Sequence, residues 1–293
     1  SRELIAHHYD LSNELFQLFL DPTMSYSSGL FESDARGMPV LPPAPEDAGL
    51  EEAQARKIER LLDVTGVREG SRVLEIGTGW GELALRAARR GAHVHSVTLS
   101  TEQLELARKR VAEAGVADRV QIELCDYRAI TTAHPGRQYN AVVSVEMIEA
   151  VGAEYWASYF QTIDSVLAPD GQVGIQAITM PHDRMLATRG GFTWINKYIF
   201  PGGFLPSTDV IEQVTRDHTT LRVRERLDFG QHYAETLRQW DQRFLAAHDR
   251  VLELGFDEIF VRMWHFYLEY SRAGFASGYL DVNQIVLDRG GRP

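Results

Sequence analysis

Hydrophobic and polar positions alternate along the middle of the chain in a way that predicts helices and strands in turn. Residues 50–67 place apolar side chains on one side of a helix (Leu50, Ala53, Ile58, Leu61 and Leu62). Short apolar runs typical of buried strands follow at residues 71–77, 92–100, 118–126, 139–146 and 171–179, and helical patterns lie between most of them. Strands that alternate with helices form right-handed crossovers, so the pattern predicts a doubly wound, mostly parallel α/β sheet.

The pattern changes after about residue 181. An aromatic, irregular segment is followed by two long helical patterns and a last strand-like run that would return to the sheet (residues 182–207, 232–255, 256–277 and 278–288). Ahead of the sheet, residues 1–20 have apolar positions at helical spacing. Residues 37–49 are rich in Pro and Gly, which predicts an irregular surface segment.

Composition and charge narrow the class of protein. The 293 residues are 44% hydrophobic and 24% charged, which is typical of a globular chain with one large domain or two small ones. The net charge of −11 argues against nucleic acid as the main partner. The single cysteine, Cys125, excludes an internal disulfide and fits a cytoplasmic location. No apolar run reaches the roughly 18 residues of a membrane span.

A glycine-rich loop joins the first predicted strand to its helix in the stretch LEIGTGWGEL. Glycines at 77, 79 and 81 let the backbone turn tightly and approach a ligand at a helix N-terminus. A dinucleotide fingerprint requires glycine at its sixth position, where this chain has Glu82. The G-x-G-x-G spacing with Glu75 before it resembles motif I of class I methyltransferases, which bind S-adenosylmethionine (SAM). The resemblance implies that Glu75 lies near the amino-acid end of the cofactor.

Polar residues after the next two strands are further candidates for cofactor contacts. Many such folds have an acidic residue after the second strand, but here Thr98 and Gln103 are the polar candidates for the ribose. After the third strand, Asp126 could accept from the adenine amino group and Tyr127 could pack on the ring. Simple core packing of Tyr127 is an equal alternative.

Four stretches together resemble the cyclopropane-fatty-acyl-phospholipid synthase family: HHYDLSNELFQLFLDPTMSYSSGLF, VLEIGTGWGELALRAA, VSVEMIEAVG and WINKYIFPGGFLPS. The resemblance covers nearly the whole chain and implies transfer of a SAM methyl group to a cis double bond of a phospholipid acyl chain, with S-adenosylhomocysteine as the second product. It implies that Tyr9, Tyr26 and Ser27 help to hold SAM. Longer family members have a small N-terminal helical domain. Since this chain opens on a helix-like stretch without Met, we expect a separate N-terminal domain ahead of residue 1.

The resemblance also suggests a division of the chain around a seven-stranded, Rossmann-like sheet. Residues 1–48 would form an N-terminal helix and a loop that covers cofactor and substrate, and residues 49–180 the SAM-binding core. Residues 181–276 would form a mainly helical cap that binds lipid, and residues 277–293 a returning strand and tail.

The chemistry implied by the resemblance accounts for the aromatic residues. A carbocation forms on the acyl chain, and aromatic faces stabilise cations without capturing them. The segment FTWINKYIF and five aromatic residues of the cap could supply such a lining: Tyr233, Trp264, Phe266, Tyr267 and Tyr270. For any single one of them, plain core packing is the simpler interpretation.

In enzymes of this family, removal of the proton is attributed to a bound bicarbonate, which a cysteine, a glutamate, a histidine and a tyrosine hold. Matched by position, the glutamate is Glu149 and the tyrosine is Tyr233, whereas Ser28 and Gln176 replace the cysteine and the histidine. Glu146 stands where the family commonly has Gly. We therefore expect Glu146 to replace bicarbonate as the general base. Because Glu146 and Glu149 are close together, we expect the pKa of one of these two carboxyl groups to be raised. The alternative is that Glu146 caps a helix or contacts SAM while bicarbonate still binds.

A base at this position affects which product forms. The stretch SVEMIEAVG resembles the actinobacterial branch that makes 10-methylene and 10-methyl (tuberculostearic-type) fatty acids, so a 10-methylene product is expected, with saturation left to a separate reductase. Cyclopropane formation on the same oleoyl-type substrate is one alternative. A small-molecule amine methyltransferase and a non-catalytic SAM-fold partner subunit are the others.

Contact with a membrane surface is expected because the implied substrate lies in a bilayer. Residues 182–200 mix Arg184, Arg189 and Lys197 with the aromatic Phe192, Trp194, Tyr198 and Phe200, which suits the anionic inner face of the cell membrane. A lid over the active site would have the same composition.

No His pair with a carboxylate stands at metal-ligand spacing, so no metal is expected. The sequence leaves open whether the chain forms a homo-oligomer.

Overall fold

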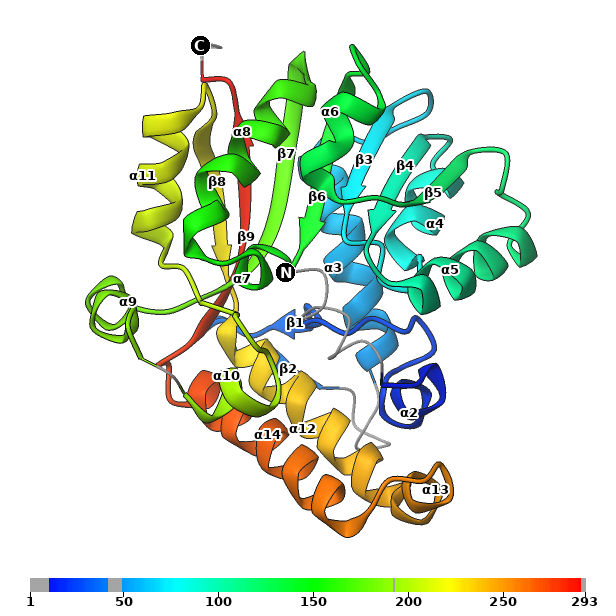
Figure 1. The fold of residues 1–293 in the computed structure, drawn as a ribbon, viewed down its shortest axis with the longest axis vertical. Helices are drawn as coiled ribbons and strands as arrows, with labels where there is room; N and C mark the ends of the chain where they lie inside the picture. Colours follow the sequence, from blue (N-terminus) through cyan, green and yellow to red (C-terminus); the bar gives the residue numbers. More distant parts are fainter. Residues whose placement is uncertain (1–10, 42–48, 192, 291–293) are drawn as a thin grey trace.

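The apolar runs of the alternating region form a seven-stranded sheet in the order β5-β4-β3-β6-β7-β9-β8 (Figure 1). The computed structural model describes residues 11–41, 49–191 and 193–290. The strands are β3 (Arg72–Ile76), β4 (His93–Thr98), β5 (Val120–Leu124), β6 (Tyr139–Val145), β7 (Leu167–Thr179), β8 (Arg222–Asp228) and β9 (Asp281–Asp288). The first five pair in parallel, and β9 runs antiparallel to both β7 and β8. The predicted doubly wound α/β class is confirmed.

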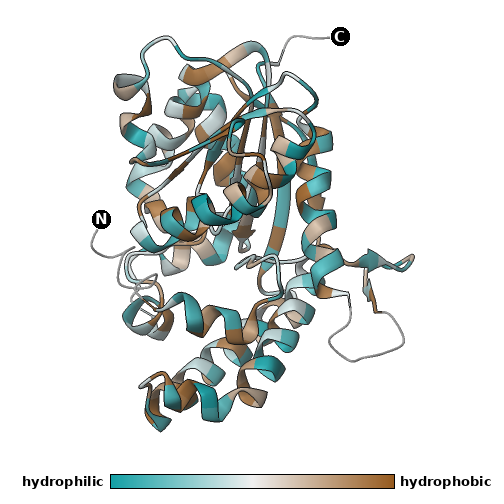
Figure 2. Cartoon of the chain, turned by 90° about the vertical axis from the view of Figure 1, so that its right-hand side faces the viewer, coloured by the Kyte–Doolittle hydropathy of each residue, from teal (hydrophilic) through white to brown (hydrophobic). Residues whose placement is uncertain are grey.

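Helices cover both faces of the sheet because each carries an apolar stripe. On one face, α3 (Leu50–Val64) and α4 (Glu82–Arg89) pack on β3, β4 and β6, and α5 (Thr101–Glu113) packs beside them on β5. The other face carries α6 (Ile130–Ala133), α8 (Trp156–Val166) and α11 (Thr208–His218). Figure 2 shows apolar residues gathered on the strands and on the inward faces of helices.

A helical layer lies beyond the carboxyl ends of the parallel strands (Figure 1). It comprises α2 (Asn13–Phe19), α10 (Trp194–Tyr198), α12 (Gly230–Ala246), α13 (His248–Glu253) and α14 (Glu258–Ala276). Its core is dense in aromatic side chains, among them Phe16, Phe19, Trp240, Phe244 and Trp264. The short elements η1 (Tyr127–Ala129), α7 (Ile148–Val151), η2 (Ala153–Tyr155) and α9 (His182–Thr188) and the hairpin β1 (Glu32–Ser33)–β2 (Pro39–Val40) complete the described fold.

Two details of the sheet differ from the sequence-based expectation. The edge strand β8 has the sequence RVRERLD, and its charged residues are mostly exposed on both faces, so it lacks the alternation that identifies a half-buried strand. The helical pattern ahead of the strand predicted for residues 171–179 ends at Val166, because Leu167 already pairs with Tyr139. The register shifts before the next pair, Ala141 with Gln172, which leaves room for the segment 168–171.

Within the described residues, no helix combines the length and the apolar composition that a membrane span requires.

Candidate active site

The glycine loop between β3 and α4 adopts backbone conformations that other residues rarely take. Gly77, Gly79 and Gly81 have φ angles of 94°, 52° and 92°. A Cβ on Gly77 would lie 2.6 Å from Cγ of Met147, and a Cβ on Gly81 would lie 3.1 Å from Cβ of Ala107. Gly77 therefore lets the exit of β6 approach the loop, and Gly81 lets α5 pack against the start of α4.

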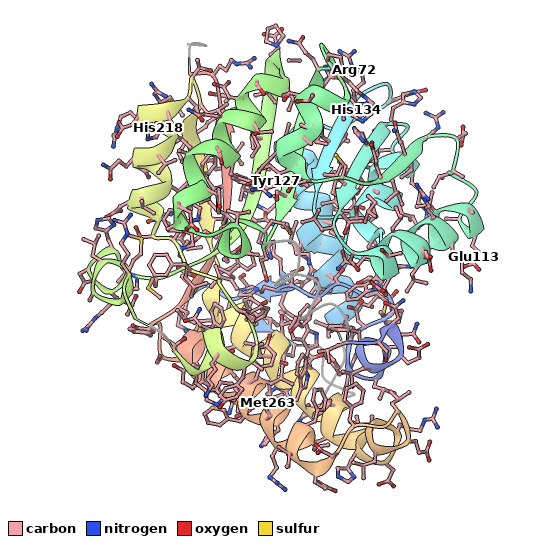
Figure 3. The ribbon with its side chains drawn as sticks, in the orientation of Figure 1. Arg72, Glu113, Tyr127, His134, His218 and Met263 are labelled. Carbon is pink, nitrogen blue, oxygen red and sulfur yellow. The ribbon has the colours of Figure 1, made fainter. Side chains whose placement is uncertain are left out.

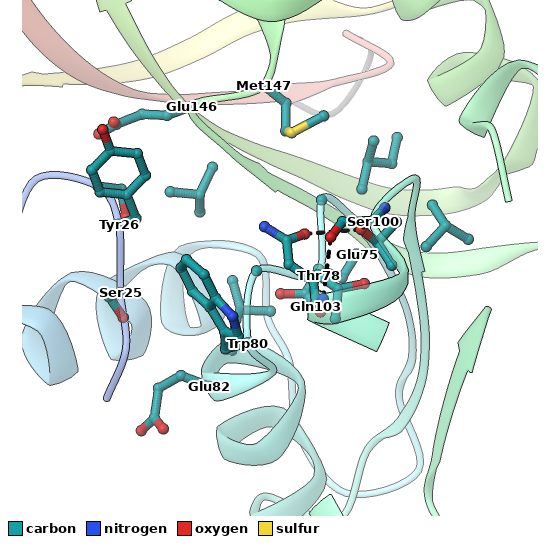
Figure 4. A pocket seen from close by; sticks show the side chains of 18 of the residues that line it. Ser25, Tyr26, Glu75, Thr78, Trp80, Glu82, Ser100, Gln103, Glu146 and Met147 are labelled. Atoms are coloured by element: carbon teal, nitrogen blue, oxygen red, sulfur yellow. Dashed lines mark hydrogen bonds between the residues drawn. The ribbon is translucent and has the colours of Figure 1, made fainter. Parts of the chain in front are cut away.

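The loop opens onto a pocket at the carboxyl ends of β3, β4 and β6 (Figure 4). Nine of the residues predicted from the sequence line it: Tyr26, Ser27, Glu75, Gly77, Gly79, Thr98, Gln103, Tyr127 and Glu146. Gly81 caps α4 behind the loop. Tyr9, also predicted to hold the cofactor, lies outside the described residues, as do His7, His8 and Phe192.

Glu75 is a buried carboxylate at the floor of this pocket. Its side chain accepts a hydrogen bond of 2.5 Å from Ser96 Oγ, and no cationic side chain pairs with it among the described residues. Burial raises the pKa of Glu75 to about 8. A cation that entered the pocket would stabilise the ionised form.

The two residues proposed for the ribose lie together at the end of β4. Thr98 Oγ1 donates to Gln103 Oε1 at 2.9 Å, and no described residue accepts from the amide nitrogen of Gln103, which is left for a ligand. Tyr127 lines the pocket and also packs against Tyr159 in the core, with ring centroids 5.3 Å apart. Its core packing is therefore confirmed, and its contact with the adenine ring stays a prediction. Figure 3 shows Tyr127 in the interior of the molecule.

Asp126 does not line the pocket as the sequence suggested. The Arg128 guanidinium donates to its carboxylate at 2.5 Å, and the Arg128 backbone N–H donates at 3.0 Å. The carboxylate caps η1 and is held by its near neighbour, an arrangement that strand–helix patterning does not reveal.

Glu146 lies at the pocket wall, and groups from three separate elements hydrogen-bond to its carboxylate. Oε1 accepts from the Ser28 backbone N–H at 2.9 Å and from Gln176 Nε2 at 2.9 Å, and Oε2 accepts from the Tyr233 hydroxyl at 2.7 Å. The residue has a φ of 51°, which turns its side chain out of β6 toward these donors. Burial raises the pKa of Glu146, while these hydrogen bonds and the charge of Lys57 oppose the rise. The replaced family positions, Ser28 and Gln176, thus both contact Glu146.

Glu149 is buried one turn further on. Its Oε1 accepts from the Ile178 backbone N–H, and its Oε2 has no hydrogen-bond partner among the described residues. Burial first, and the charge of Glu146 second, raise the pKa of Glu149 to about 8. The expected raised pKa in this carboxylate pair is therefore present at Glu149, although desolvation is its larger cause.

Lys57 is a site residue that the sequence analysis missed. Its side chain is 1% exposed and lines the pocket, and Nζ donates to Ser27 Oγ at 2.6 Å and to Gln54 Oε1 at 2.5 Å. Burial lowers the pKa of Lys57 to about 8, and the nearby carboxylate of Glu146 opposes that shift. The available signal was its spacing, since Lys57 and Gln54 occupy the same helix face as Leu50 and Leu61.

The aromatic residues proposed for the cation lining separate into two groups. Tyr233, Trp264 and Tyr267 are buried beside the site, and the hydroxyl of Tyr267 lies 2.8 Å from that of Tyr26. Phe266 and Tyr270 are 49% and 53% exposed, so the expectation that they line the active site is wrong. They stand on the opposite side of α14, where a helix turns successive residues away from each other.

His95, Glu123 and His134 form a group with metal-ligand chemistry that the sequence spacing did not reveal. Their ligand atoms lie within 4.8 Å of one another. Both histidine Nε2 atoms lie within hydrogen-bond distance of Glu123 Oε2, at 2.9 and 2.8 Å, and His95 Nδ1 lies 2.6 Å from the Tyr139 hydroxyl. Hydrogen bonds therefore join these four side chains without an ion, and the group lies outside the pocket lining.

Replacing Gly77 by alanine is expected to lower the free energy of unfolding by about 1–3 kcal/mol, because alanine is strained at this φ. The added methyl group would also contact Met147. Urea denaturation measures the loss. Gly79→Ala is the matched control, since its φ of 52° is also strained for alanine but nothing lies within 4 Å of its new Cβ. Equal losses in the two variants would contradict a contribution from the contact with Met147.

The sequence of this chain matches a known protein family and individual members of it. Residues 1–285 match the family described as mycolic acid cyclopropane synthetase. The chain is 58% identical, over all of its length, to the tuberculostearic acid methyltransferase UfaA1 of Mycobacterium tuberculosis, and 34% identical, over 97% of its length, to the cyclopropane-fatty-acyl-phospholipid synthase of Escherichia coli K12. It spans 66% and 67% of the length of these two relatives.

A solved structure has the same fold. The mycolic acid cyclopropane synthase CmaA1, crystallised with S-adenosylhomocysteine (SAH) and CTAB, superposes with a TM-score of 0.84 at 28% identity. The superposition covers 98% of this chain and 97% of that one.

Proposed function

Because this chain belongs to the mycolic acid cyclopropane synthetase family, we propose that it is a SAM-dependent C-methyltransferase acting on an unsaturated phospholipid acyl chain. The expected product is a 10-methylene chain, the precursor of a 10-methyl chain. The 58% identical relative is named for tuberculostearic acid, which supports this branch of the family. The observation that carries the proposal is the Glu146 carboxylate, held by three donors at the wall of the cofactor pocket.

The pocket fits SAM on its own chemistry. Glu75 is a buried carboxylate without a cationic partner among the described residues, and it suits the cationic amino-acid end of the cofactor. The Gln103 amide nitrogen is available for a ribose oxygen. The glycines of the loop have no side chains, so the cofactor can approach the loop backbone closely. When bound, SAM supplies an electrophilic methyl group.

The reaction needs a base placed beside a cation. The alkene electron pair forms a bond to the methyl carbon as the sulfur–carbon bond breaks, which leaves a cation on the adjacent acyl carbon. A hydride shift moves the cation to the methylated carbon, and loss of a methyl proton to Glu146 gives the exocyclic methylene. The Tyr233 hydroxyl donates to Glu146 and the Tyr267 hydroxyl contacts that of Tyr26, so three aromatic rings lie near this region, where they would stabilise positive charge.

Glu146 fills the role that the family gives to bicarbonate. Bicarbonate would need hydrogen-bond donors, and the donors of Ser28, Gln176 and Tyr233 are already directed at the Glu146 carboxylate. Without the hydride shift, loss of a methyl proton and bonding of the methyl carbon to the first cationic carbon would give a cyclopropane, so this product is the alternative on the same substrate. The buried setting of the carboxylate fits an apolar substrate better than a small amine, which would have to lose its hydration there.

The test is a product assay. The protein is incubated with SAM and vesicles of oleoyl phosphatidylglycerol, and the fatty acids are analysed by mass spectrometry and proton NMR. One added carbon with terminal-methylene protons is the expected result. High-field ring protons would overturn the methylene assignment, and the absence of any lipid product with full-length protein would overturn the proposed substrate class.

SAM binding is expected to release a proton near pH 7. Free Glu75 is largely protonated there because burial raises its pKa to about 8, and the bound cation favours the carboxylate. Affinity should therefore rise with pH until it levels off above about pH 8. Calorimetry in two buffers with different ionisation enthalpies measures the released proton. Glu75→Gln should bind without proton release and about tenfold more weakly, as expected for a lost charge-assisted contact; unchanged proton release would contradict the assignment.

A further inference from the structure

Helix α14 exposes an apolar stripe on its outer side. Its inner side buries Val261, Trp264 and Leu268, as a surface helix should. The most exposed positions along the other side include Ile259, Phe266 and Tyr270, which are 67%, 49% and 53% exposed. Arg262 and Glu269 are charged residues on the same side, and Glu269 pairs with Arg272. A solvent-facing helix side ordinarily carries polar residues, so this stripe indicates a surface that contacts something other than water.

Helix α10 extends the stripe into a wider aromatic surface. The Trp194 and Phe266 rings meet edge to face with centroids 4.7 Å apart, and Tyr198 and Tyr270 continue the row at 5.5 and 5.8 Å from Trp194 and Phe266. We call these four side chains the aromatic patch. Figure 1 shows α10 lying against α14 on the side of the helical layer away from α2, and Met263, labelled in Figure 3, lies at their junction.

The charges around the aromatic patch are mainly basic, although the whole chain has a net charge of −11. Lys197 Nζ lies 4.8 Å from the centre of the Tyr198 ring. Arg189 precedes α10, and Arg262 lies on the exposed stripe; within the part of the chain that the structure describes, no carboxylate forms an ion pair with either of them or with Lys197. Arg184 has Asp183 as a partner at 3.7 Å.

We propose that the aromatic patch and its basic rim dock the protein onto an anionic phospholipid surface. Tryptophan and tyrosine with arginine and lysine around them are typical of a membrane–water interface, where rings insert between headgroups and basic groups meet lipid phosphates. The inference rests on the proposed function, since the acyl substrate lies in a bilayer. It differs from the sequence-based expectation in two ways. Phe266 and Tyr270 now belong to the membrane-facing surface, whereas Phe200, which was expected there, packs against the helical core.

The docking surface is also joined to the active site through α14. Tyr267 follows Phe266 but faces inward, where its hydroxyl meets that of Tyr26, a residue of the cofactor pocket. Phe200 packs against the Tyr267 ring at 5.8 Å. One helix therefore carries exposed aromatic residues on one side and, on the other, a residue that contacts the cofactor pocket.

The experiment compares flotation with vesicles of oleoyl phosphatidylglycerol and of oleoyl phosphatidylcholine, without SAM. Wild type should float with the anionic vesicles and less with the neutral ones, and high salt should weaken binding. The double variant Phe266→Ser/Tyr270→Ser should bind at least about tenfold more weakly, since two inserted rings are lost. The control is Leu124→Ser, a 38% exposed residue on β5 at the far edge of the sheet, and it should bind like wild type.

Each outcome separates docking from the proposed reaction. Unchanged vesicle binding by the double variant would overturn the docking site even if wild type methylates the lipid. Vesicle binding by wild type without methyl transfer would leave docking supported and contradict the reaction. If the patch instead joins two copies of the chain, wild type without lipid would sediment as a dimer, the double variant as a monomer, and vesicle binding would not change; that result would also overturn the proposal.

Discussion

Replacing Glu146 by glutamine is expected to lower the rate of lipid methylation on the order of 10³-fold, which is the contribution of a positioned general base. The variant should fold, because the glutamine oxygen can accept from Ser28 N–H and Gln176 Nε2 while its amide nitrogen donates to the Tyr233 oxygen. SAM binding should stay within about twofold, since the methyl donor is held by other residues and not by the base. Steady-state kinetics on vesicles, with SAM affinity measured by calorimetry, tests both statements.

A second variant tests whether Glu146 acts as the general base or only forms hydrogen bonds with its neighbours. Glu146→Gly empties the three-donor site without strain, because a φ of 51° suits glycine. Bicarbonate added to this variant should restore part of the activity, whereas wild type should not respond to it. Near-full activity of Glu146→Gln, or a bicarbonate requirement in wild type, would show that Glu146 is not the base.

The sequence predicted the sheet well where burial imposes a simple pattern. Strands buried on both faces read as apolar runs, so β3, β4, β6 and β7 were identifiable, and the glycine spacing located the cofactor loop. The edge strand β8 escaped notice because its charged side chains face solvent on both sides. Hydrophobic periodicity indicates which residues are buried, and few residues of β8 are buried.

Side-chain partners were harder to predict than elements. Glu146 and Glu149 were identifiable because carboxylates at the end of a buried strand are unusual, but their different environments depend on donors distant in sequence, such as Tyr233. Asp126 pairs with its near neighbour Arg128 and lies outside the pocket lining, and the strand–helix pattern predicted neither. In α14, aromatic residues occupy both the buried and the exposed sides, so composition could not separate site residues from surface residues.

Lys57→Met is expected to lower the rate of methylation at pH 7 by about 10²-fold, an effect within the range of electrostatic terms in buried sites. The Lys57 ammonium favours the ionised form of Glu146, so its loss should raise the Glu146 pKa further. A base with a higher pKa is less available at neutral pH, and the rising limb of the pH–rate profile should therefore move to higher pH. Activity should recover as the pH is raised.

The structure suggests that this variant folds. Methionine fills a volume similar to that of lysine, and the described residues form no ion pair with Nζ within 4.0 Å, so the substitution removes a buried cation without stranding a direct partner charge. Lys109→Met is the control, because Lys109 is exposed on α5 and its ion pair with Glu113 is 3.9 Å long. A rate loss of the same size at every pH would mean that Lys57 acts by packing or by holding the cofactor. A loss that disappears at high pH would mean that this buried lysine keeps Glu146 ionised, and that the site depends on a charge pair whose members are not in contact.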